Sequence, residues 1–209
     1  MKQPPAYIIT QNSYTQHPAS YRNYCISQKN SQHSQHCAAQ LGWRVTTWPA
    51  VDGFTVDHST WDRIGVKLLN RGAIIKRPGA RGCFHSHFGL WQHCVNLGEP
   101  IIVLEHDARV QQPWDTGLDL TQCVWKLHRA DGRGEEQNEI TGHWSRGAWA
   151  YTLTPAQAGQ LIDFSRSVGA QAVDKQIGAN VVEWRYTNTD MVIHRPAQRI
   201  STTSLKLSL

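Results

Sequence analysis

The 209-residue sequence lacks several features that would place it in a specialised class of protein. It contains no run of about 20 apolar residues that could cross a bilayer, and no apolar segment follows Met1 as in a secretory signal. Its five cysteines form no C-x-x-C pair of the kind that binds zinc, and their odd number favours free thiols in a reducing compartment. No long run of Lys and Arg points to nucleic acid. We therefore expect a cytoplasmic protein with no transmembrane segment and no nucleic-acid partner.

What the sequence does contain is typical of a globular domain. Apolar residues make up 40% of the chain and charged residues 18%, and there are nine tryptophans, a composition that can supply a sizeable core. The length fits one domain, for which we expect residues 1–195, followed by a polar C-terminal tail at 196–209. The net charge of +5 and the pI near 9.1 suit an anionic ligand such as a phosphate, or peripheral contact with an anionic membrane surface.

The most informative stretch is an apolar run, Ile101 to Leu104, that leads directly into Glu105, His106 and Asp107. Apolar residues without alternation predict a strand buried on both faces, and sheets of such strands place their chemistry at the carboxyl ends of the strands. Side chains of a strand alternate between its faces, so Glu105 and Asp107 should point to one side and His106 to the other. Two carboxylates on one side suit Mg²⁺ or Mn²⁺, although a solvated acidic loop is an alternative.

Other apolar runs and turn signals predict strands and helices that alternate along the chain. We expect further strands at 6–10, 43–48, 123–127, 149–153, 181–186 and 191–194, and helices at 20–41, 60–69, 81–97, 154–168 and 174–177. Residues 131–142, rich in Gly and Glu, predict an exposed loop. The alternation is typical of the α/β class, with a central and mainly parallel sheet flanked by helices.

Several sequence motifs occur together and in a fixed order. Gly82-Cys83-x-x-Ser86-His87-x-x-x-Trp91 is followed closely by Leu104-Glu105-x-Asp107-Ala108, a combination that is specific although each fragment alone is not. Around these motifs lie four further matching segments: Ala6–Thr10, Pro49–Gly53, Gly147–Leu153 and Val173–Asp174. In these motifs the chain resembles glycosyltransferase family 25, which contains bacterial lipopolysaccharide galactosyltransferases and collagen galactosyltransferase domains.

The resemblance implies a single GT-A-like domain that acts as a hexosyltransferase. Such an enzyme would move a sugar such as galactose, with inversion, from a nucleotide-sugar donor such as a UDP-sugar to a hydroxyl of a glycan or lipid-linked saccharide. The resemblance also implies a divalent cation, Mn²⁺ or Mg²⁺, that offsets the charge of the departing diphosphate. We expect Asp107 as its direct ligand, Glu105 acting through a metal-bound water or the donor ribose, and His194 as an additional ligand.

Three further residues are candidates for a role in the site, Asp174 from the resemblance and Ser86 and His87 from their position. Asp174 matches the Val-Asp position of the family and is our candidate for the base that activates the acceptor hydroxyl; its alternative role is the N-cap of a short helix. Ser86 and His87 are expected near a helix start, where they would orient the motif acids or contact the donor diphosphate. His87 could equally be a core residue, because it lies on an apolar stripe of its helix.

The sequence departs from the family pattern at two places. His106 stands where the family usually has an acid, and residues 11–24 lack the usual Asn-Leu-Asp and a clear Arg pattern for base and ribose recognition. One alternative is therefore a degenerate domain that binds a sugar nucleotide without catalysis. Another is a metal-dependent phosphoesterase that uses the same acids with His85, His87 and His106.

Overall fold

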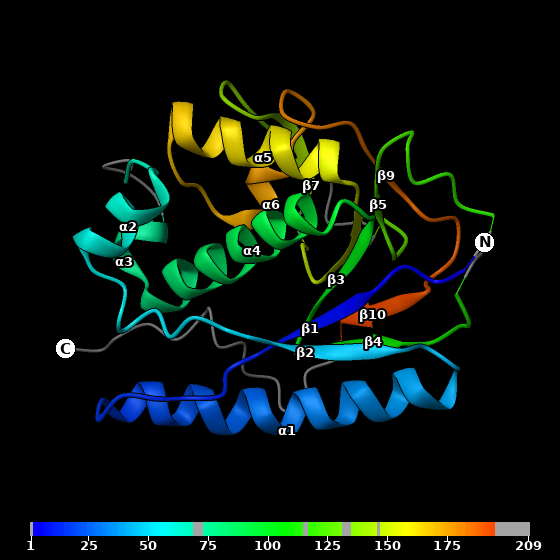
Figure 1. The fold of residues 1–209 in the computed structure, drawn as a ribbon, viewed down its shortest axis with the longest axis horizontal. Helices are drawn as coiled ribbons and strands as arrows, with labels where there is room; N and C mark the ends of the chain where they lie inside the picture. The colour runs from blue at the N-terminus through cyan, green and yellow to red at the C-terminus, as the bar shows by residue number, and fades with distance from the viewer. Residues whose placement is uncertain (1, 69–72, 115–116, 131–134, 146, 195–209) are drawn as a thin grey trace.

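A six-stranded sheet forms the centre of the protein (Figure 1). The computed structural model describes residues 2–68, 73–114, 117–130, 135–145 and 147–194. The strands of this sheet are β1 (Ala6–Thr10), β2 (Val45–Pro49), β3 (Ile101–Glu105), β5 (Val124–Lys126), β8 (Ala150–Leu153) and β9 (Trp184–Tyr186). Their order across the sheet is β2-β1-β3-β8-β5-β9. Of these six, only β8 runs against its neighbours, so the sheet is mainly parallel, as the sequence predicts.

Helices cover both faces of the sheet (Figure 1). One face carries α1 (Pro18–Gln40), and the other carries α4 (Pro78–Leu97) and α5 (Pro155–Val168), which pack together. Each of these long helices begins with a proline in its first turn, where the missing N–H group has no intrahelical partner to lose. In the described parts of the chain, no helix is long and apolar enough to cross a membrane.

β3 has a continuous apolar sequence because both of its faces are covered. Ile101 and Val103 lie in the core that β3 forms with α4 and α5. Ile102 and Leu104 lie in a second core, on the side of α1. All four side chains are fully buried. Since the side chains of a strand alternate, Glu105 shares the α4 side with Ile101 and Val103.

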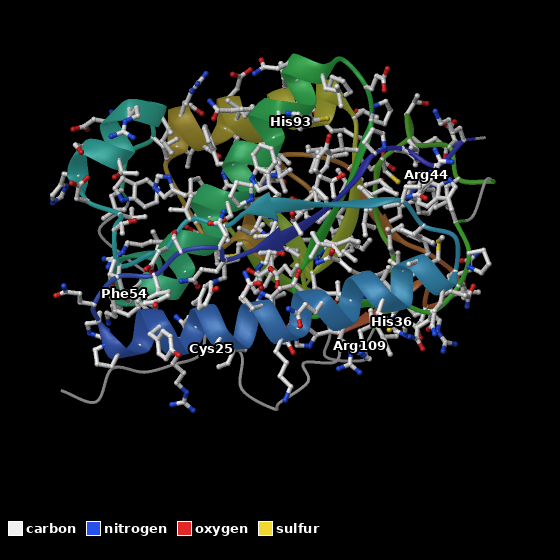
Figure 2. The ribbon with its side chains drawn as sticks, turned by 60° about the horizontal axis from the view of Figure 1, so that its bottom comes forward. Cys25, His36, Arg44, Phe54, His93 and Arg109 are labelled. Carbon is white, nitrogen blue, oxygen red and sulfur yellow. The ribbon has the colours of Figure 1, made fainter. Side chains whose placement is uncertain are left out.

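The face of α1 that packs on the sheet is polar rather than apolar. Its buried residues include Ser20, Asn23, Ser27, Asn30, Ser31 and Ser34. Two of these side chains bind the end of β1: the hydroxyl oxygens of Ser31 and Thr10 are 2.6 Å apart, and the backbone N–H of Gln11 donates to Ser27 Oγ at 2.9 Å. The outer face, which carries Cys25, is exposed (Figure 2). Hydrogen bonds therefore help to hold α1 against the sheet, although apolar contacts usually hold a helix in such a position.

Two further short strands lie beside the main sheet. β4 (Ala108–Val110) follows β3 after a two-residue turn and pairs antiparallel with β10 (Val192–His194). This pairing places His194 opposite Ala108. The strand predicted at 191–194 is thus confirmed, and it connects the late part of the chain to the acidic motif.

The predicted loop at 131–142 is wrong in part. Within it, β6 (Glu135–Asn138) pairs antiparallel with β7 (Gly142–Ser145) as a hairpin, and residues 131–134 lie outside the described part. The strand β6 consists of polar residues without apolar alternation, so no strand pattern is visible in the sequence.

The helix predicted at 60–69 is shorter and begins earlier, as α2 (His58–Ile64). Asp57 caps it, since its carboxylate accepts from the backbone N–H of Thr60 at 2.9 Å, and Gly65 ends it with φ of 69° in the left-handed region. Two further short helices are α3 (Ala73–Lys76) and α6 (Val173–Gln176). The tail predicted at 196–209 lies outside the described residues.

Candidate active site

A pocket opens where β1 and β3 end and α4 begins. The two strands are parallel neighbours, so their carboxyl ends meet at one edge of the sheet, the edge at which α/β proteins commonly bind ligands. The pocket contains about 580 Å³ of empty space, part of it open to solvent. Polar and aromatic residues that line it include Gln11, Asn23, Asp52, Phe54, Glu105 and His106.

Close backbone packing forms one wall of this pocket. The loop after β2 lies against the first turns of α4, and a Cβ atom on Gly53 would overlap the carbonyl oxygen of Pro78. A Cβ atom on Gly82 would overlap the carbonyl oxygen of Val51 in the same way. Ser86 Oγ secures the contact, because it accepts from the Val51 N–H at 2.9 Å and donates to the Gly82 carbonyl at 2.6 Å. The Ser86 hydroxyl thus holds the wall in place.

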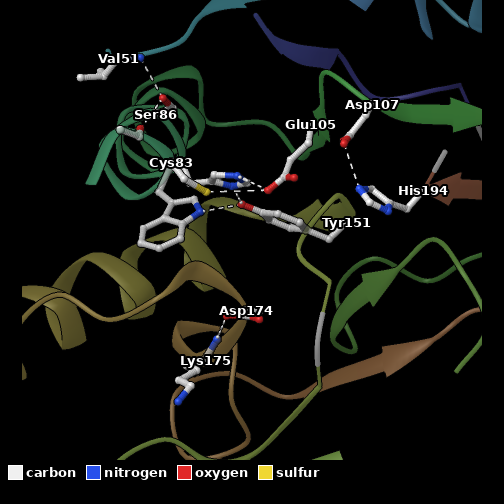
Figure 3. A network of polar contacts seen from close by, with 12 residues as sticks. Val51, Cys83, Ser86, Glu105, Asp107, Tyr151, Asp174, Lys175 and His194 are labelled. Atoms are coloured by element: carbon white, nitrogen blue, oxygen red, sulfur yellow. Dashed lines mark hydrogen bonds and ion pairs between the residues drawn. The ribbon is translucent and has the colours of Figure 1, made fainter. Parts of the chain in front are cut away.

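Glu105 ends β3 on the α4 side of the sheet (Figure 3). Its Oε1 lies 3.4 Å from His87 Nε2 and accepts from the thiol of Cys83 at 3.8 Å. Burial raises the pKa of Cys83 well above its usual value, and the charge of Glu105 raises it further, so the thiol keeps its proton at neutral pH. Among the described residues, Oε2 has no protein partner, and the side chain is 26% exposed. One oxygen of Glu105 is therefore held by α4 while the other is open to a ligand.

The expected placement of Glu105 and Asp107 on one side, with His106 on the other, is wrong. β3 ends at Glu105, and residues 106–107 form a turn, so strand alternation does not extend to Asp107. His106 lines the pocket together with Glu105. Asp107 turns toward β10, where its Oδ2 lies 2.9 Å from His194 Nε2 (Figure 3).

Asp107 and His194 are suited to bind a cation together. Asp107 is 4% exposed, and its Oδ1 is a buried oxygen that has no hydrogen-bond partner in the described part of the chain. Burial opposes the ionisation of Asp107, but the hydrogen bond from His194 and the nearby ring of His106 keep its pKa below the usual value. The pair thus offers an ionised carboxylate and an imidazole, a donor set that fits Mn²⁺.

The third expected metal ligand, Glu105, belongs to a different group. Within the described ranges, Cys83, His87 and Glu105 are the set of three metal-binding side chain types whose ligand atoms all lie within 4.8 Å of one another. The structure therefore brings together Asp107 with His194, and Glu105 with His87. Whether the three predicted ligands share one ion stays a prediction.

Ser86 and His87 do not lie near a helix start as expected. Since α4 begins at Pro78, they are its ninth and tenth residues. His87 is fully buried, and its Nδ1 lies 2.8 Å from the phenol oxygen of Tyr151. From the sequence, His87 is either a core residue or a residue that contacts a motif acid. In the structure it is both.

The three histidines that a phosphoesterase would need are not all at one place. His87 and His106 both line the pocket, together with Glu105. His85 does not line it and packs against Trp61, with ring centroids 4.2 Å apart, and burial lowers the pKa of His85 to about 4. His85 and His106 are both outside the metal-type group found in the described residues.

Asp174 lies within electrostatic reach of Glu105. The N-cap of α6 is Ala172, so the alternative role of Asp174 as the cap of this helix is wrong. Its Oδ1 accepts from the backbone N–H of Lys175 at 3.0 Å. Burial raises the pKa of Asp174 and the charge of Glu105 adds to this, while Lys126 and the hydrogen bond from Lys175 oppose it. A carboxylate with a raised pKa is a stronger base, which fits the predicted role.

The sequence motifs missed two buried residues near this site. Lys126 of β5 is fully buried, and its ammonium group lies 4.6 Å from the centroid of the Trp184 ring. Because lysine is almost never fully buried without a specific reason, its place inside a predicted strand was a signal that could have singled it out. Tyr151 bonds His87 from 64 positions away, a partnership that no spacing in the sequence indicates.

The fold and the site define an α/β domain with a ligand pocket and acidic side chains at the carboxyl ends of its strands. The sequence model of glycosyltransferase family 25 (LPS biosynthesis protein) matches residues 20–138, which is more than half of the chain. The chain therefore belongs to glycosyltransferase family 25, as its motifs predict.

Curated relatives match shorter parts of the chain. A "Glycosyltransferase 25 family member" of Aedes aegypti is 40% identical over 78 residues, which are 34% of this chain and 13% of the relative. A "Probable inactive glycosyltransferase 25 family member 3" of Rattus norvegicus is 31% identical over 137 residues, or 54% of this chain and 24% of the relative. The chain thus matches less than a quarter of the length of either protein.

Among solved structures, a glycosyltransferase involved in the glycosylation of the major capsid of PBCV-1 is similar in outline. The match has a TM-score of 0.42 at 9% sequence identity and covers 88% of this chain and 81% of that chain. At this level of similarity it assigns no function.

Proposed function

We propose that this chain is a metal-dependent, inverting hexosyltransferase of the GT-A type that uses a nucleotide-sugar donor such as a UDP-sugar. The observation that carries the proposal is the placement of Glu105, Asp107 and His194 around the end of β3, beside a pocket that opens at the same edge of the sheet. Membership of glycosyltransferase family 25 supports the same class of reaction. The acceptor would be a hydroxyl of a glycan or of a lipid-linked saccharide.

The pocket would hold the nucleoside part of the donor. Its lining combines apolar and aromatic surface, such as Ile9 and Phe54, with polar groups that can fix orientation. Asn23 Oδ1 and His106 Nε2 are buried atoms without hydrogen-bond partners in the described residues, and both belong to residues of this lining. Buried polar atoms are costly when unpaired, so a ligand that pairs them gains binding energy. The free oxygen of Glu105 would contact the ribose or a metal-bound water.

Asp107 and His194 would hold the divalent cation, Mn²⁺ or Mg²⁺. When bound, the cation would offset negative charge on the departing diphosphate without a proton transfer. The orphaned Oδ1 of Asp107 supports this role, because a buried carboxylate oxygen with no donor is costly unless a ligand uses it. Without the cation, His194 Nε2 donates to the other oxygen and so orients the carboxylate. To bind the cation through the same nitrogen, His194 would have to carry its proton on Nδ1 instead.

Asp174 would take the proton of the acceptor hydroxyl as that hydroxyl attacks the anomeric carbon. Its buried carboxylate is partly desolvated, and the neighbouring charge of Glu105 further favours the proton on Asp174. General-base assistance of this kind contributes about 10²- to 10⁴-fold to a rate. A single displacement at the anomeric carbon with such a base inverts its configuration.

A second candidate function is donor binding without catalysis. The Rattus norvegicus relative bears the name of a probable inactive family member, and His106 replaces the acid that is usual at the centre of the family motif. In this case the pocket, with a cation held by Asp107 and His194, would bind a sugar nucleotide, and no sugar would be transferred.

The test is a screen of UDP-galactose, UDP-glucose and UDP alone, each with and without Mn²⁺, by thermal shift. A ligand at 100 times its Kd should stabilise the native protein by about 2.7 kcal/mol. Each binding donor is then incubated with a saccharide acceptor, and UDP release and product are measured. Binding with transfer supports the transferase, and binding without transfer supports the second candidate. Absence of binding by every nucleotide would contradict both.

A further inference from the structure

Three buried side chains connect the interior of the protein to Glu105. Trp91 Nε1 lies 2.9 Å from the phenol oxygen of Tyr151, and this oxygen lies 2.8 Å from His87 Nδ1. On the other side of the His87 ring, Nε2 lies 3.4 Å from Glu105 Oε1. Trp91, Tyr151 and His87 are each fully buried, so water does not compete for these contacts.

The chemistry of the donors determines which group donates and which accepts in each of these hydrogen bonds. An indole N–H can only donate, so Trp91 donates to the oxygen of Tyr151. The phenol proton of Tyr151 then needs an acceptor, and in the described part of the chain the one within reach is His87 Nδ1. Burial raises the pKa of Tyr151 well above its usual value, so this proton stays on the phenol.

If Nδ1 accepts, the proton of a neutral His87 ring must sit on Nε2. Nε2–H then lies near the carboxylate of Glu105, 3.4 Å from Oε1, but it is not aligned for a hydrogen bond in the free protein. A metal ligand would need a lone pair on Nε2, which this tautomer does not have. The Nε2–H tautomer of His87 thus argues against a metal site formed by Cys83, His87 and Glu105.

We propose that Trp91 and Tyr151 are positioning residues: they fix the Nε2–H tautomer of His87, whose Nε2 faces Oε1 of Glu105 and leaves Oε2 to the donor or to a metal-bound water. The two hydrogen bonds from Trp91 to Tyr151 and from Tyr151 to His87 stand on the structure alone, whereas the alignment of His87 with Glu105 on donor binding rests on the proposed function. The thiol of Cys83 assists by donating to the same Oε1. Glu105 is partly exposed at the pocket and would otherwise be free to change rotamer.

The first experiment reads the tautomer directly in the free protein. The full chain is labelled with ¹⁵N-histidine, the His87 signals are assigned by their loss in His87→Asn, and long-range ¹H–¹⁵N spectra identify the protonated nitrogen. We expect Nε2 protonated and Nδ1 bare, and a change in this pattern in Tyr151→Phe. A wild-type ring protonated at Nδ1, or at both nitrogens, would overturn the proposal, because Tyr151 could not then donate to it.

The second experiment measures the effect on Glu105 through the affinity for UDP with Mn²⁺. Tyr151→Phe should weaken binding by about tenfold, since it leaves two buried groups unpaired and frees the ring of His87. The matched control is Tyr7→Phe. Tyr7 makes the same kind of bond, with its phenol oxygen 2.8 Å from His93 Nε2, but neither residue lines the pocket. Equal losses in the two variants would mean that the effect is structural and would contradict the proposal.

A pair of substitutions at His87 separates positioning from folding, and it remains informative if Tyr151→Phe does not fold. The amide nitrogen of Gln matches the position of Nε2, whereas that of Asn matches Nδ1. His87→Gln should therefore retain more UDP affinity than His87→Asn, by about tenfold, at similar melting temperatures. Equal affinities would overturn the positioning role. If UDP binds no variant and not the wild type, the proposed function fails, while the tautomer measurement still decides on the hydrogen-bond chain.

Discussion

Asp107 and His194 are 87 positions apart in the sequence, yet Oδ2 of one and Nε2 of the other are separated by 2.9 Å. The pairing of β4 with β10 produces this contact, because it places His194 opposite Ala108, the residue next to Asp107. The second oxygen of Asp107 is buried without a partner in the described residues. The structure therefore holds one carboxylate oxygen in place and leaves the other to be used by a ligand.

The first prediction concerns this pair. Asp107→Asn should raise the Kd for UDP with Mn²⁺ by at least about 100-fold, or ~2.7 kcal/mol, because an amide oxygen is a far weaker ligand for a divalent cation than a carboxylate. Isothermal titration with and without EDTA measures the change. Asp62→Asn, at an exposed position of α2, is the control and should leave the affinity unchanged. Equal affinities of Asp107→Asn and wild type in Mn²⁺ and in EDTA would remove Asp107 from the metal site.

The second prediction concerns the wall of the pocket. Gly82→Ala should lower the free energy of unfolding by about 1–3 kcal/mol, because the new methyl group would collide with the backbone carbonyl of Val51. Gly159→Ala in α5 is the control. A Cβ atom there meets no atom within 4 Å, and alanine favours a helix over glycine by about 1 kcal/mol, so this variant should be at least as stable as wild type. Urea denaturation measures both, and equal stabilities of the two variants would contradict the close packing.

The elements that the sequence predicts well are those whose signals are local. The apolar run of β3, the proline that starts α5 and the glycine after α4 specify their own segments, and the structure has them there, whereas α4 begins three residues earlier than predicted. The position of Glu105 on the α4 side also follows, because it is the last residue to which strand alternation applies.

The site was predicted less well because its contacts are not local. Where β3 ends depends on the pairing of the strands that follow it, so alternation could not be extended to Asp107. The polar inner face of α1 looks like a solvated face in the sequence, since serine and asparagine are equally suited to water and to the hydroxyl of Thr10 or the N–H of Gln11. Tyr151 lies in an ordinary strand pattern, and nothing in that pattern indicates that the fold places it next to His87.

The third prediction concerns His106, where the family pattern usually has an acid. His106 lines the pocket next to Glu105, so His106→Asp adds a carboxylate beside the place of the donor diphosphate. In Mn²⁺ the Kd for UDP should change by no more than about tenfold, ~1.4 kcal/mol, whereas in EDTA binding should weaken, because the added charge repels the diphosphate. Titrations of UDP in the two buffers measure this. A loss in Mn²⁺ as large as that of Asp107→Asn would show that the imidazole itself is required.

The fourth prediction concerns the stability of the free protein as a function of pH. Burial raises the pKa of Asp174 above its usual value, so folding favours the protonated form. The contribution of Asp174 is fully present below its unfolded pKa and is lost as the pH rises through the folded pKa. Asp174→Asn has no such loss, so its melting temperature relative to wild type should increase from about pH 4 to pH 7. A difference that decreases over this range would mean that the ionised form is the one stabilised by folding.

The fifth prediction decides whether Asp174 is the base of the transfer. Asparagine keeps the size of the side chain and the oxygen that accepts from the Lys175 N–H, but its amide cannot take a proton from the acceptor hydroxyl. Asp174→Asn should therefore lower the transfer rate by at least about 100-fold, ~2.7 kcal/mol, while the Kd for UDP with Mn²⁺ stays within about twofold. Asp163→Asn, at an exposed position of α5, is the control and should transfer at the wild-type rate. Transfer by Asp174→Asn at a rate near that of wild type would give Asp174 a structural role and leave the proton to another carboxylate on the acceptor side.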